Sequence, residues 1–352
     1  MGHLKFEGVK IAGISACVPA KTIENSQFGS SLFTEEELKK TIDSIGVYQR
    51  HVSPSEICTS DLCFEAASEL LEKLSVNRED VNAVIFVSQT PDYRLPATAC
   101  ILQDKLGLKK GTLAFDINLG CSGYVYGLSM AFSFLNQPAI SKVLLLVGDT
   151  SSKNVSPQDK SSNLLFGDAG SATLIEKDSS ASPVYCSLSS DGSGAKSLII
   201  EGGGYRLPSS EFTVKVTEGP DKNLRSKENI FMDGPEIFNF TLREIPKDII
   251  GLLDAANATV EDIDLFFFHQ ANKFMVDYLA RKLKIPAEKY PLSLSSYGNT
   301  SSASIPLTIV DAENKLRAGR TRLVLSGFGV GLSWGSMLLD LNDCKILPVI
   351  TI

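Results

Sequence analysis

Apolar runs alternate with helical patterns along the chain. The run at residues 84–87 (VIFV) follows a helical pattern near 62–74, and the run at 143–147 (VLLLV) follows another near 122–135. Continuous apolar runs of this length are typical of strands in a sheet that helices cover on both faces. The pattern therefore predicts an α/β protein.

This pattern occurs twice. The segment LLEKLSVNREDVNAVIF from Leu70 aligns without gaps with LLDAANATVEDIDLFFF from Leu252. The paired leucines, an aspartate and the onset of the strand coincide in this alignment. The apolar strands KVLLLVGD from Lys142 and TRLVLSGFG from Thr321 match at a similar offset of about 180 residues. Two matches in the same order and at the same offset indicate a duplicated unit.

A polar stretch separates the two copies. Residues 177–235 are rich in Gly and Ser (DGSGAK, EGGGYRLPSS) and show no strong period, which is typical of a surface excursion. We therefore predict an N-terminal half at residues 1–176 and a C-terminal half at residues 177–352.

Composition narrows the possible partners. The 352 residues can bury a large core, and a net charge of −7 argues against nucleic acid, because phosphate neutralisation needs a basic face. No run of about 18 apolar residues is present to span a bilayer. The start, MGHLKFEGVKIAG, lacks the basic-then-apolar order of a signal peptide. We expect a cytoplasmic protein without membrane insertion.

The seven cysteines are scattered without CxxC spacing, and there are only three histidines. This distribution suggests neither a metal site nor a disulfide framework. Most of the cysteines are expected to be small buried hydrophobic residues.

Cys121 lies where an apolar strand ends at a tight turn (LGCSG) and a helix of small and apolar residues begins. Unpaired N–H groups at a helix N-terminus favour thiolate over thiol, so the position suits a nucleophile. A buried structural cysteine packed beneath Gly120 and Gly123 fits the same motif.

Two further segments place polar side chains at ends of elements. His269 ends the apolar strand DLFFFH, and active sites of α/β proteins cluster at such carboxyl ends. Asn299 sits in the turn YGNTSSASIP, before an apolar helix. A hydrogen-bonded structural histidine and a turn-forming asparagine are the alternatives.

The glycine-rich segment GFGVGLSWG, residues 327–335, follows an apolar strand. It lacks both the spacing of a dinucleotide fingerprint and the lysine of a phosphate loop. A turn that wraps a substrate or supplies an oxyanion donor fits this segment, and so does a purely structural hairpin turn.

Five segments resemble, in their order and wording, the motifs of β-ketoacyl-acyl-carrier-protein synthase III and its relatives in the thiolase superfamily. They are AFDINLGCSGYVYGL, LLFGDAGSATLI, FFFHQAN, YGNTSSASIP and GFGVGLSWG. The resemblance spans roughly residues 10–340. It implies two βαβαβαββ halves in a five-layer αβαβα sandwich, usually a homodimer. It also implies a decarboxylating condensing enzyme, or 3-oxoacyl-[acyl-carrier-protein] synthase III.

The resemblance assigns roles to individual residues. Cys121, in the N-terminal half, resembles the acylated nucleophile, while His269 and Asn299, in the C-terminal half, resemble the pair that hydrogen-bonds the extender's thioester oxygen. The backbone N–H groups of Cys121 and Val330 match the oxyanion hole. No metal or other cofactor is implied, and the substrates are thioesters of coenzyme A or acyl carrier protein.

The sequence departs from the bacterial initiators that stack a Trp and an Arg on the adenine of coenzyme A. Its only Trp is Trp334, and Phe274 stands at the position of the Arg. We therefore expect delivery by acyl carrier protein, with acyl-CoA as the other possibility. Leu95, at a position of dimer contact, and Phe328 are expected to line the acyl pocket.

The carrier protein is acidic, so its docking site is expected to be basic. The candidates follow HQAN on a helix and are Arg281, Lys282 and Lys284. A solvated helix face explains these three residues equally well.

Three other functions use the same residue types. The first is transfer of the acyl group from Cys121 to an amine or hydroxyl in a polyketide or surface-saccharide pathway. The second is a Cys-His-Asn thiol hydrolase, although no CGSCW-like stretch occurs near the N-terminus. The third is a non-catalytic protein that only binds acyl chains.

Overall fold

The computed structural model describes residues 2–28, 32–317 and 319–352. Its first large sheet has seven strands, in the order β17-β2-β8-β7-β5-β6, with β18 also paired to β2. The bounds are β2 (Val9–Val18), β5 (Ala83–Val87), β6 (Leu113–Ile117), β7 (Lys142–Asp149), β8 (Ala169–Lys177), β17 (Lys345–Ile346) and β18 (Ile350–Thr351). β5 runs parallel to β6 and β7, whereas β8 is antiparallel to β2 and β7.

The second large sheet has five strands, in the order β1-β9-β16-β15-β14. The bounds are β1 (His3–Phe6), β9 (Val184–Ser190), β14 (Leu265–Phe268), β15 (Arg320–Gly329) and β16 (Ser333–Asn342). β14 is parallel to β15, and the other neighbours are antiparallel.

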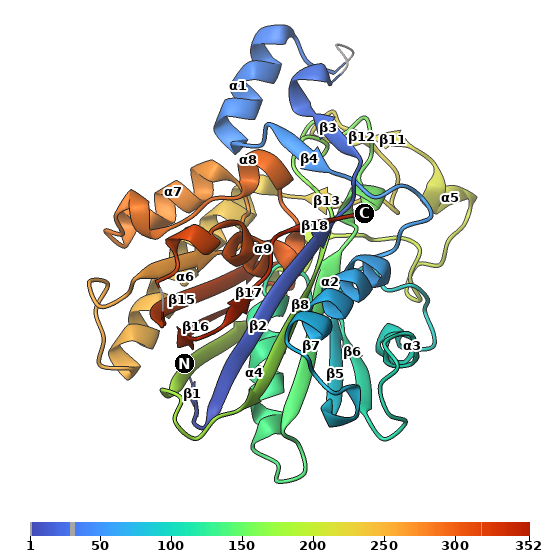
Figure 1. Ribbon diagram of the computed structural model, residues 1–352. Coiled ribbons are helices and arrows are strands. Elements are labelled where there is room, and N and C mark those ends of the chain that lie inside the picture. The colour runs from blue at the N-terminus through green and yellow to red at the C-terminus, as the bar shows by residue number, and fades with distance from the viewer. Residues whose placement is uncertain (1, 29–31, 318) are drawn as a thin grey trace.

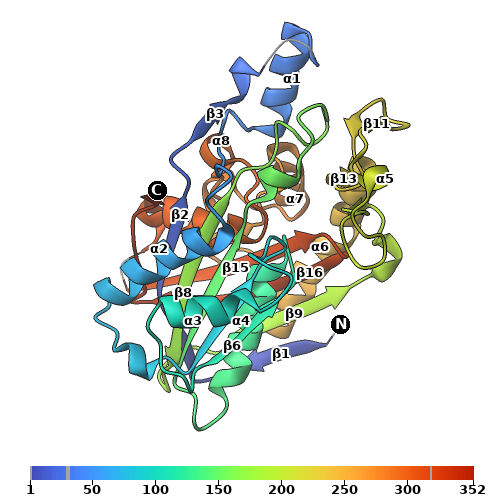
Figure 2. The ribbon, with the colours of Figure 1, turned by 90° about the vertical axis from the view of Figure 1, so that its right-hand side faces the viewer.

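Helices form three layers around the two sheets (Figures 1 and 2). α4 (Gly123–Leu135) and α9 (Ser304–Asp311) contact both sheets and form the central layer. α2 (Thr59–Lys73) and α3 (Thr98–Lys105) cover the outer face of the first sheet. α6 (Gly234–Ala255) covers the outer face of the second sheet, and α7 (Lys273–Lys282) packs against α6. The arrangement is the five-layer αβαβα sandwich that was predicted.

The apolar strands β5 and β7 are buried because helices cover both faces of their sheet, as the sequence predicted. All of β5 and nearly all of β7 are buried. One apolar cluster fills the space between the sheets, and two others lie beneath the outer helices. The predicted strands and helices of the N-terminal half coincide with β5, β7, α2 and α4.

The duplication predicted from the repeat is also confirmed. β5 lies parallel to β7 in one sheet, and β14, its match in the repeat, lies parallel to β15 in the other. The chain termini exchange sheets, because β1 pairs with β9 while β17 and β18 pair with β2. The division at residue 176 stays a prediction.

The excursion predicted for residues 177–235 is wrong over its first part. β9 lies inside the second sheet, between β1 and β16. The later part does form short peripheral elements. These are β10 (Leu198–Ile199), α5 (Glu211–Val214), β11 (Thr217–Glu218), β12 (Leu224–Arg225) and β13 (Phe231–Met232). Of these, α5, β11 and β12 are visible at the upper right of Figure 1.

The remaining strands and α-helices lie in the upper part of Figure 1. They are β3 (Thr22–Glu24), β4 (Gln49–His51), α1 (Glu35–Ile45) and α8 (Leu294–Tyr297). Thr34 and Glu37 form a reciprocal capping box at the start of α1, and Gly46 ends the helix with a φ of 72°. α1 packs against α7. Within the described ranges, no helix combines the length and the apolar character needed to cross a membrane.

Candidate active site

Cys121, His269 and Asn299 line one cavity of about 70 Å³, although they come from three separate parts of the chain. Cys121 precedes α4, His269 follows β14 and Asn299 follows α8. All three are buried. The rest of the lining is mostly apolar and comprises Leu165, Phe166, Leu198, Met232, Gly234, Ile237, Ala271, Asn272, Met275, Phe328 and Gly329.

Cys121 occupies the predicted turn between a strand and a helix. β6 ends at Ile117, the N–H of Gly123 donates to Gly120 O at 2.6 Å, and α4 begins at Gly123. Burial raises the pKa of the Cys121 thiol to about 11, and the N–H groups of Val330 and Cys121 oppose that rise. The sequence predicted that the helix N-terminus would favour the thiolate; burial outweighs this effect.

His269 directly continues β14, and its N–H donates to Ser326 O of β15 at 2.8 Å. Its Nδ1 lies 2.8 Å from Ser304 Oγ in the first turn of α9. This contact fixes the ring and leaves Nε2 for a substrate. Burial lowers the pKa of His269 to about 3, so the imidazole is neutral at ordinary pH.

Asn299 is fixed by its backbone and by its side chain. Its N–H donates to Leu165 O at 2.9 Å, and its C=O accepts from Gly167 N at 3.1 Å. The side-chain Oδ1 accepts from Ser301 N at 2.9 Å, and Nδ2 donates to Ala271 O at 3.3 Å. With the acceptor occupied, the second N–H of Nδ2 is available as a hydrogen-bond donor to a ligand.

The glycine-rich segment forms the hairpin between β15 and β16 and also reaches the thiol. A Cβ atom on Gly329 would lie 2.8 Å from Cys121 Sγ, so only glycine allows this approach. The next N–H, that of Val330, donates toward the same sulfur. The turn is therefore a structural hairpin that also brings an N–H group to the thiol, and its role as an oxyanion donor stays a prediction.

The two predicted pocket residues differ in position. Phe328 lines the cavity, with its ring centroid 5.6 Å from that of His269 in an edge-to-face arrangement. Leu95 is 77% exposed and does not line the cavity of its own chain. Its predicted role depends on a partner subunit and stays a prediction.

Trp334 and Phe274, the two aromatic residues compared with the coenzyme A clamp, lie in different surroundings. Trp334 is buried in β16 and packs on Phe240 at 5.3 Å, so it cannot stack on a ligand at the entrance. Phe274 is 51% exposed and stacks on Phe238 at 5.4 Å, which leaves one face of its ring free.

Arg281 and Lys282 end α7 and Lys284 follows it, so the three predicted docking residues lie at the end of the helix that is distal to the cavity. The cavity meets this helix at its start, through Asn272 and Met275. Arg281, Lys282 and Lys284 are exposed, and Lys282 Nζ donates to Leu242 O at 2.7 Å. None of the three lines the cavity.

Sequence reasoning missed several residues around the site. Leu165 and Phe166 lie in the quoted motif LLFGDAGSATLI, but no role was given to them. Asp149, at the end of β7, is fully buried and accepts from Gln89 N at 2.7 Å and from Ser302 Oγ at 2.6 Å. Its carboxylate links the turn after β5 to the segment that follows Asn299. An aspartate that directly ends a buried strand was the available signal.

Comparison with known proteins identifies the family of this chain. Sequence models described as 3-oxoacyl-[acyl-carrier-protein] synthase III and its C-terminal part match residues 115–195 and 253–341. The β-ketoacyl-[acyl-carrier-protein] synthase III of Clostridium perfringens is 36% identical over 341 residues, covering 96% of this chain and all of that protein. The chain belongs to the 3-oxoacyl-[acyl-carrier-protein] synthase III family.

Solved structures extend the likeness to the whole fold. A 3-oxoacyl-(acyl-carrier-protein) synthase from Burkholderia xenovorans superposes with a TM-score of 0.93 at 40% identity, over 100% of this chain and 99% of the other. The synthase III of Thermus thermophilus gives 0.79 at 32% identity, over 94% and 98%. The synthase III family consists of condensing acyltransferases, so acyl transfer to an amine or hydroxyl, thiol hydrolysis and passive acyl binding are not favoured.

Proposed function

We propose that Cys121 receives the acyl group in a decarboxylative condensation and that His269 and Asn299 bind the extender's thioester oxygen. The observation that supports this proposal is the convergence of the three side chains on one buried, mostly apolar cavity. Thiol, imidazole and amide are the groups that acyl transfer and enolate stabilisation require.

In the first step, Cys121 Sγ attacks the carbonyl carbon of the primer thioester. The bond from that carbon to the carrier sulfur breaks, and the thiol proton ends on the departing carrier. The negative charge that develops on the carbonyl oxygen is stabilised by the N–H groups of Cys121 and Val330, both of which face the sulfur.

In the second step, malonyl thioester loses carbon dioxide, and the electron pair moves onto the thioester oxygen. Nε2–H of neutral His269 and Nδ2–H of Asn299 donate to this enolate. Its carbon attacks the acyl group, the bond to Sγ breaks, and the Cys121 thiolate takes up a proton. Decarboxylation supplies the carbon nucleophile, so we propose that no cofactor takes part.

We further propose that an acyl carrier protein delivers the acyl group. The relatives are named for this carrier, and Trp334, the only tryptophan, is buried and packed on Phe240. An acidic carrier helix would meet Arg281, Lys282 and Lys284, and such contacts weaken as salt rises. A cytoplasmic location stays a prediction from the sequence.

A homodimer is the last part of the proposal. β6 has β5 as its only strand partner within the described ranges, so its other edge is available for pairing. Exposed apolar side chains lie on β6, on the nearby loops and on α5, and include Tyr93, Leu95, Leu113, Tyr205 and Phe212. Figure 2 shows α3, β6 and α4 toward the viewer, on this side of the molecule. Such a surface is typical of a protein interface.

Intact-protein mass spectrometry tests the assignment of the nucleophile. Incubation with acyl thioesters should add one acyl mass to the wild type and none to Cys121→Ser, because an alkoxide is far less available than a thiolate. Cys100→Ser is the matched control, since Cys100 is a free and exposed thiol. A full acyl shift in Cys121→Ser, or its loss in Cys100→Ser, would contradict the proposal.

A further inference from the structure

A second hollow, of about 360 Å³, lies beside the catalytic cavity and shares no lining residue with it. It opens between the β3–β4 ribbon and the segment at residues 152–163. Its apolar wall includes Ile23, Phe28, Val52 and Val155. Its size falls in the range of about 300–1,000 Å³ that is usual for small-molecule sites.

Arg50 lines this hollow and is 4% exposed. Its Nε donates to Asn25 Oδ1 at 2.8 Å, and Nη1 donates to Phe166 O at 3.1 Å. Its Nη2 makes no hydrogen bond to the residues that the structure describes. The guanidinium therefore keeps N–H donors for a ligand.

No carboxylate in the described ranges lies within 4.0 Å of Arg50, and burial lowers the pKa of the guanidinium to about 10. The acid that faces it is Asp168, whose oxygens already accept from Ser53 N at 2.7 Å and from Ser152 Oγ at 2.6 Å. A buried cation without a close counter-ion is costly, and an entering anion would reduce that cost.

Lys153 adds a second positive charge at the exposed side of the hollow. Its Nζ donates to Ser55 O at 3.1 Å and to Ile57 O at 2.6 Å, and no carboxylate pairs with it among the described residues. The buried cation Arg50, the exposed cation Lys153 and the apolar wall together suit a carboxylate that bears a short hydrocarbon chain. Arginine binds carboxylates through paired, parallel hydrogen bonds.

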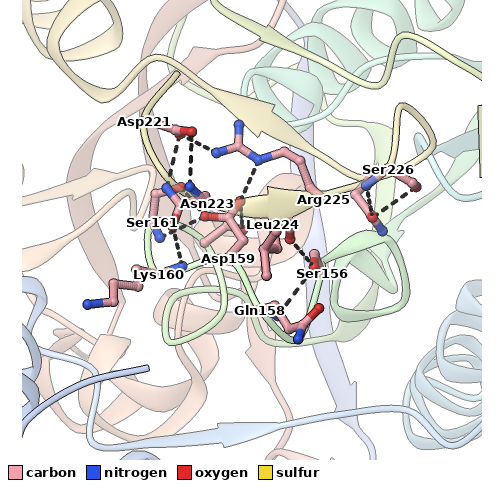
Figure 3. A network of polar contacts seen from close by, with 12 residues as sticks. Ser156, Gln158, Asp159, Lys160, Ser161, Asp221, Asn223, Leu224, Arg225 and Ser226 are labelled. Atoms are coloured by element: carbon pink, nitrogen blue, oxygen red, sulfur yellow. Dashed lines mark hydrogen bonds and ion pairs between the residues drawn. The ribbon is translucent and has the colours of Figure 1, made fainter. Parts of the chain in front are cut away.

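The wall formed by the segment at residues 152–163 is held from its other side by the polar network in Figure 3. Ser156 Oγ donates to Leu224 O at 2.6 Å, and Lys160 N donates to Asn223 Oδ1 at 2.9 Å. Arg225 Nε lies 3.3 Å from Asp159 Oδ2. This wall is thus in place before any ligand arrives, which lowers the cost of binding.

We propose that this hollow binds a small monocarboxylate with a short apolar chain, through Arg50, at a site separate from Cys121. Arg50 also holds the carbonyl of Phe166, whose side chain lines the catalytic cavity. Arg50 is therefore the residue at which the second site adjoins the wall of the first.

Calorimetric titration with sodium hexanoate tests this site, using protein whose Cys121 has been carbamidomethylated and, in parallel, untreated protein. We expect one hexanoate per chain with the same Kd in both samples. 1-Hexanol, which has the same chain without the charge, should bind at least about tenfold more weakly. Loss of hexanoate binding after alkylation would place the ligand in the catalytic cavity and overturn the proposal.

Two substitutions locate the ligand within the protein. Arg50→Lys keeps the charge but removes the paired donors, and should weaken hexanoate binding by at least about tenfold. Lys153→Glu reverses a charge at the exposed side of the hollow. If Arg50→Lys fails to fold, this variant tests whether hexanoate binds there. Lys109→Glu is the control, because Lys109 Nζ likewise donates to a backbone carbonyl, Glu79 O, but does not line the hollow. Equal hexanoate affinity in Lys153→Glu and Lys109→Glu would refute the site.

Discussion

At the scale of single residues, burial shifts the two titratable groups of the catalytic cavity in opposite directions. It raises the pKa of Cys121 to about 11 and lowers that of His269 to about 3, so at neutral pH the pair is thiol and neutral imidazole. Such a pair differs from the thiolate and imidazolium of a pre-activated thiol enzyme. Nucleophilic attack must therefore gain its driving force from the bound thioester and from the N–H groups around the sulfur.

The neutral donors lead to a prediction about decarboxylation. His269→Ala and Asn299→Ala should each slow carbon dioxide release from malonyl thioester about a hundred- to a thousandfold, or by about 3–4 kcal/mol, because each removes one donor to the enolate oxygen. Both variants should still acylate Cys121 measurably. Radiolabelled carbon dioxide release and acyl mass shifts check the two steps separately, and unchanged release in both variants would remove these residues from the mechanism.

A residue far from the cavity gives a prediction about pH. Asp248, on α6, is fully buried, and the side chains that face its carboxylate are the hydroxyls of Ser336 and Ser187. Burial raises its pKa. The folded state therefore keeps the proton to a higher pH than the unfolded state does. Stability decreases as pH rises from the unfolded pKa of about 3.9 through the folded value.

Asp248→Asn should consequently raise the free energy of unfolding at about pH 7, by about 1–3 kcal/mol, and the gain should shrink toward about pH 4. Urea denaturation at the two pH values measures both. Asp262→Asn is the control with the opposite sign. Asp262 accepts from Thr259 N at 2.8 Å, and this contact lowers its pKa. Asp262→Asn should therefore destabilise the protein at about pH 7. A less stable Asp248→Asn protein at neutral pH would contradict the argument.

At the scale of elements, the sequence predicted those whose burial is uniform. β5 and β7 are continuous apolar runs because helices cover both faces of their sheet. β9 was missed because its sequence, VYCSLSS, mixes apolar and polar positions and lies in a Gly- and Ser-rich neighbourhood. Its Ser187 is nevertheless fully buried, so composition alone gave the wrong expectation there.

The β11–β12 hairpin gives the prediction at this scale. Arg225 is 9% exposed and pairs with Asp159, which is fully buried, and with Asp221. Removing one member of a buried ion pair costs about 3–5 kcal/mol, because the other charge remains buried. Arg225→Met should therefore increase hydrogen exchange at residues 217–231. Lys227→Met, which breaks an exposed pair with Glu201, is the control and should change exchange little. Similar exchange in both variants would show that the network does not hold the hairpin.

At the scale of the whole molecule, the motifs singled out Cys121, His269 and Asn299, which line one cavity, but the rest of the cavity wall could not be predicted. Leu198 and Met232 belong to the polar excursion, which shows no period that would bring them toward the catalytic residues. They reach the cavity because β10 pairs with β13 and places both residues beside Ile237 of α6. Contacts of this kind depend on tertiary packing, which a local pattern does not record.

The proposed homodimer gives the last prediction. Arg94 connects two of the exposed apolar loops, since its guanidinium lies 5.6 Å from the ring of Tyr205 and its Nη2 donates to Gly203 O at 2.5 Å. Leu95, beside it, is 77% exposed and is expected to enter the partner's acyl pocket. Leu95→Asp would bury an unpaired carboxylate in that interface, which costs several kcal/mol.

Analytical ultracentrifugation should therefore find the wild type dimeric and Leu95→Asp largely monomeric, with slower Cys121 acylation. Ile250→Asp changes an apolar residue of similar kind, 51% exposed on α6, and should leave the dimer intact. If Leu95→Asp remains as dimeric as Ile250→Asp, the subunits meet elsewhere and Leu95 has no part in the acyl pocket.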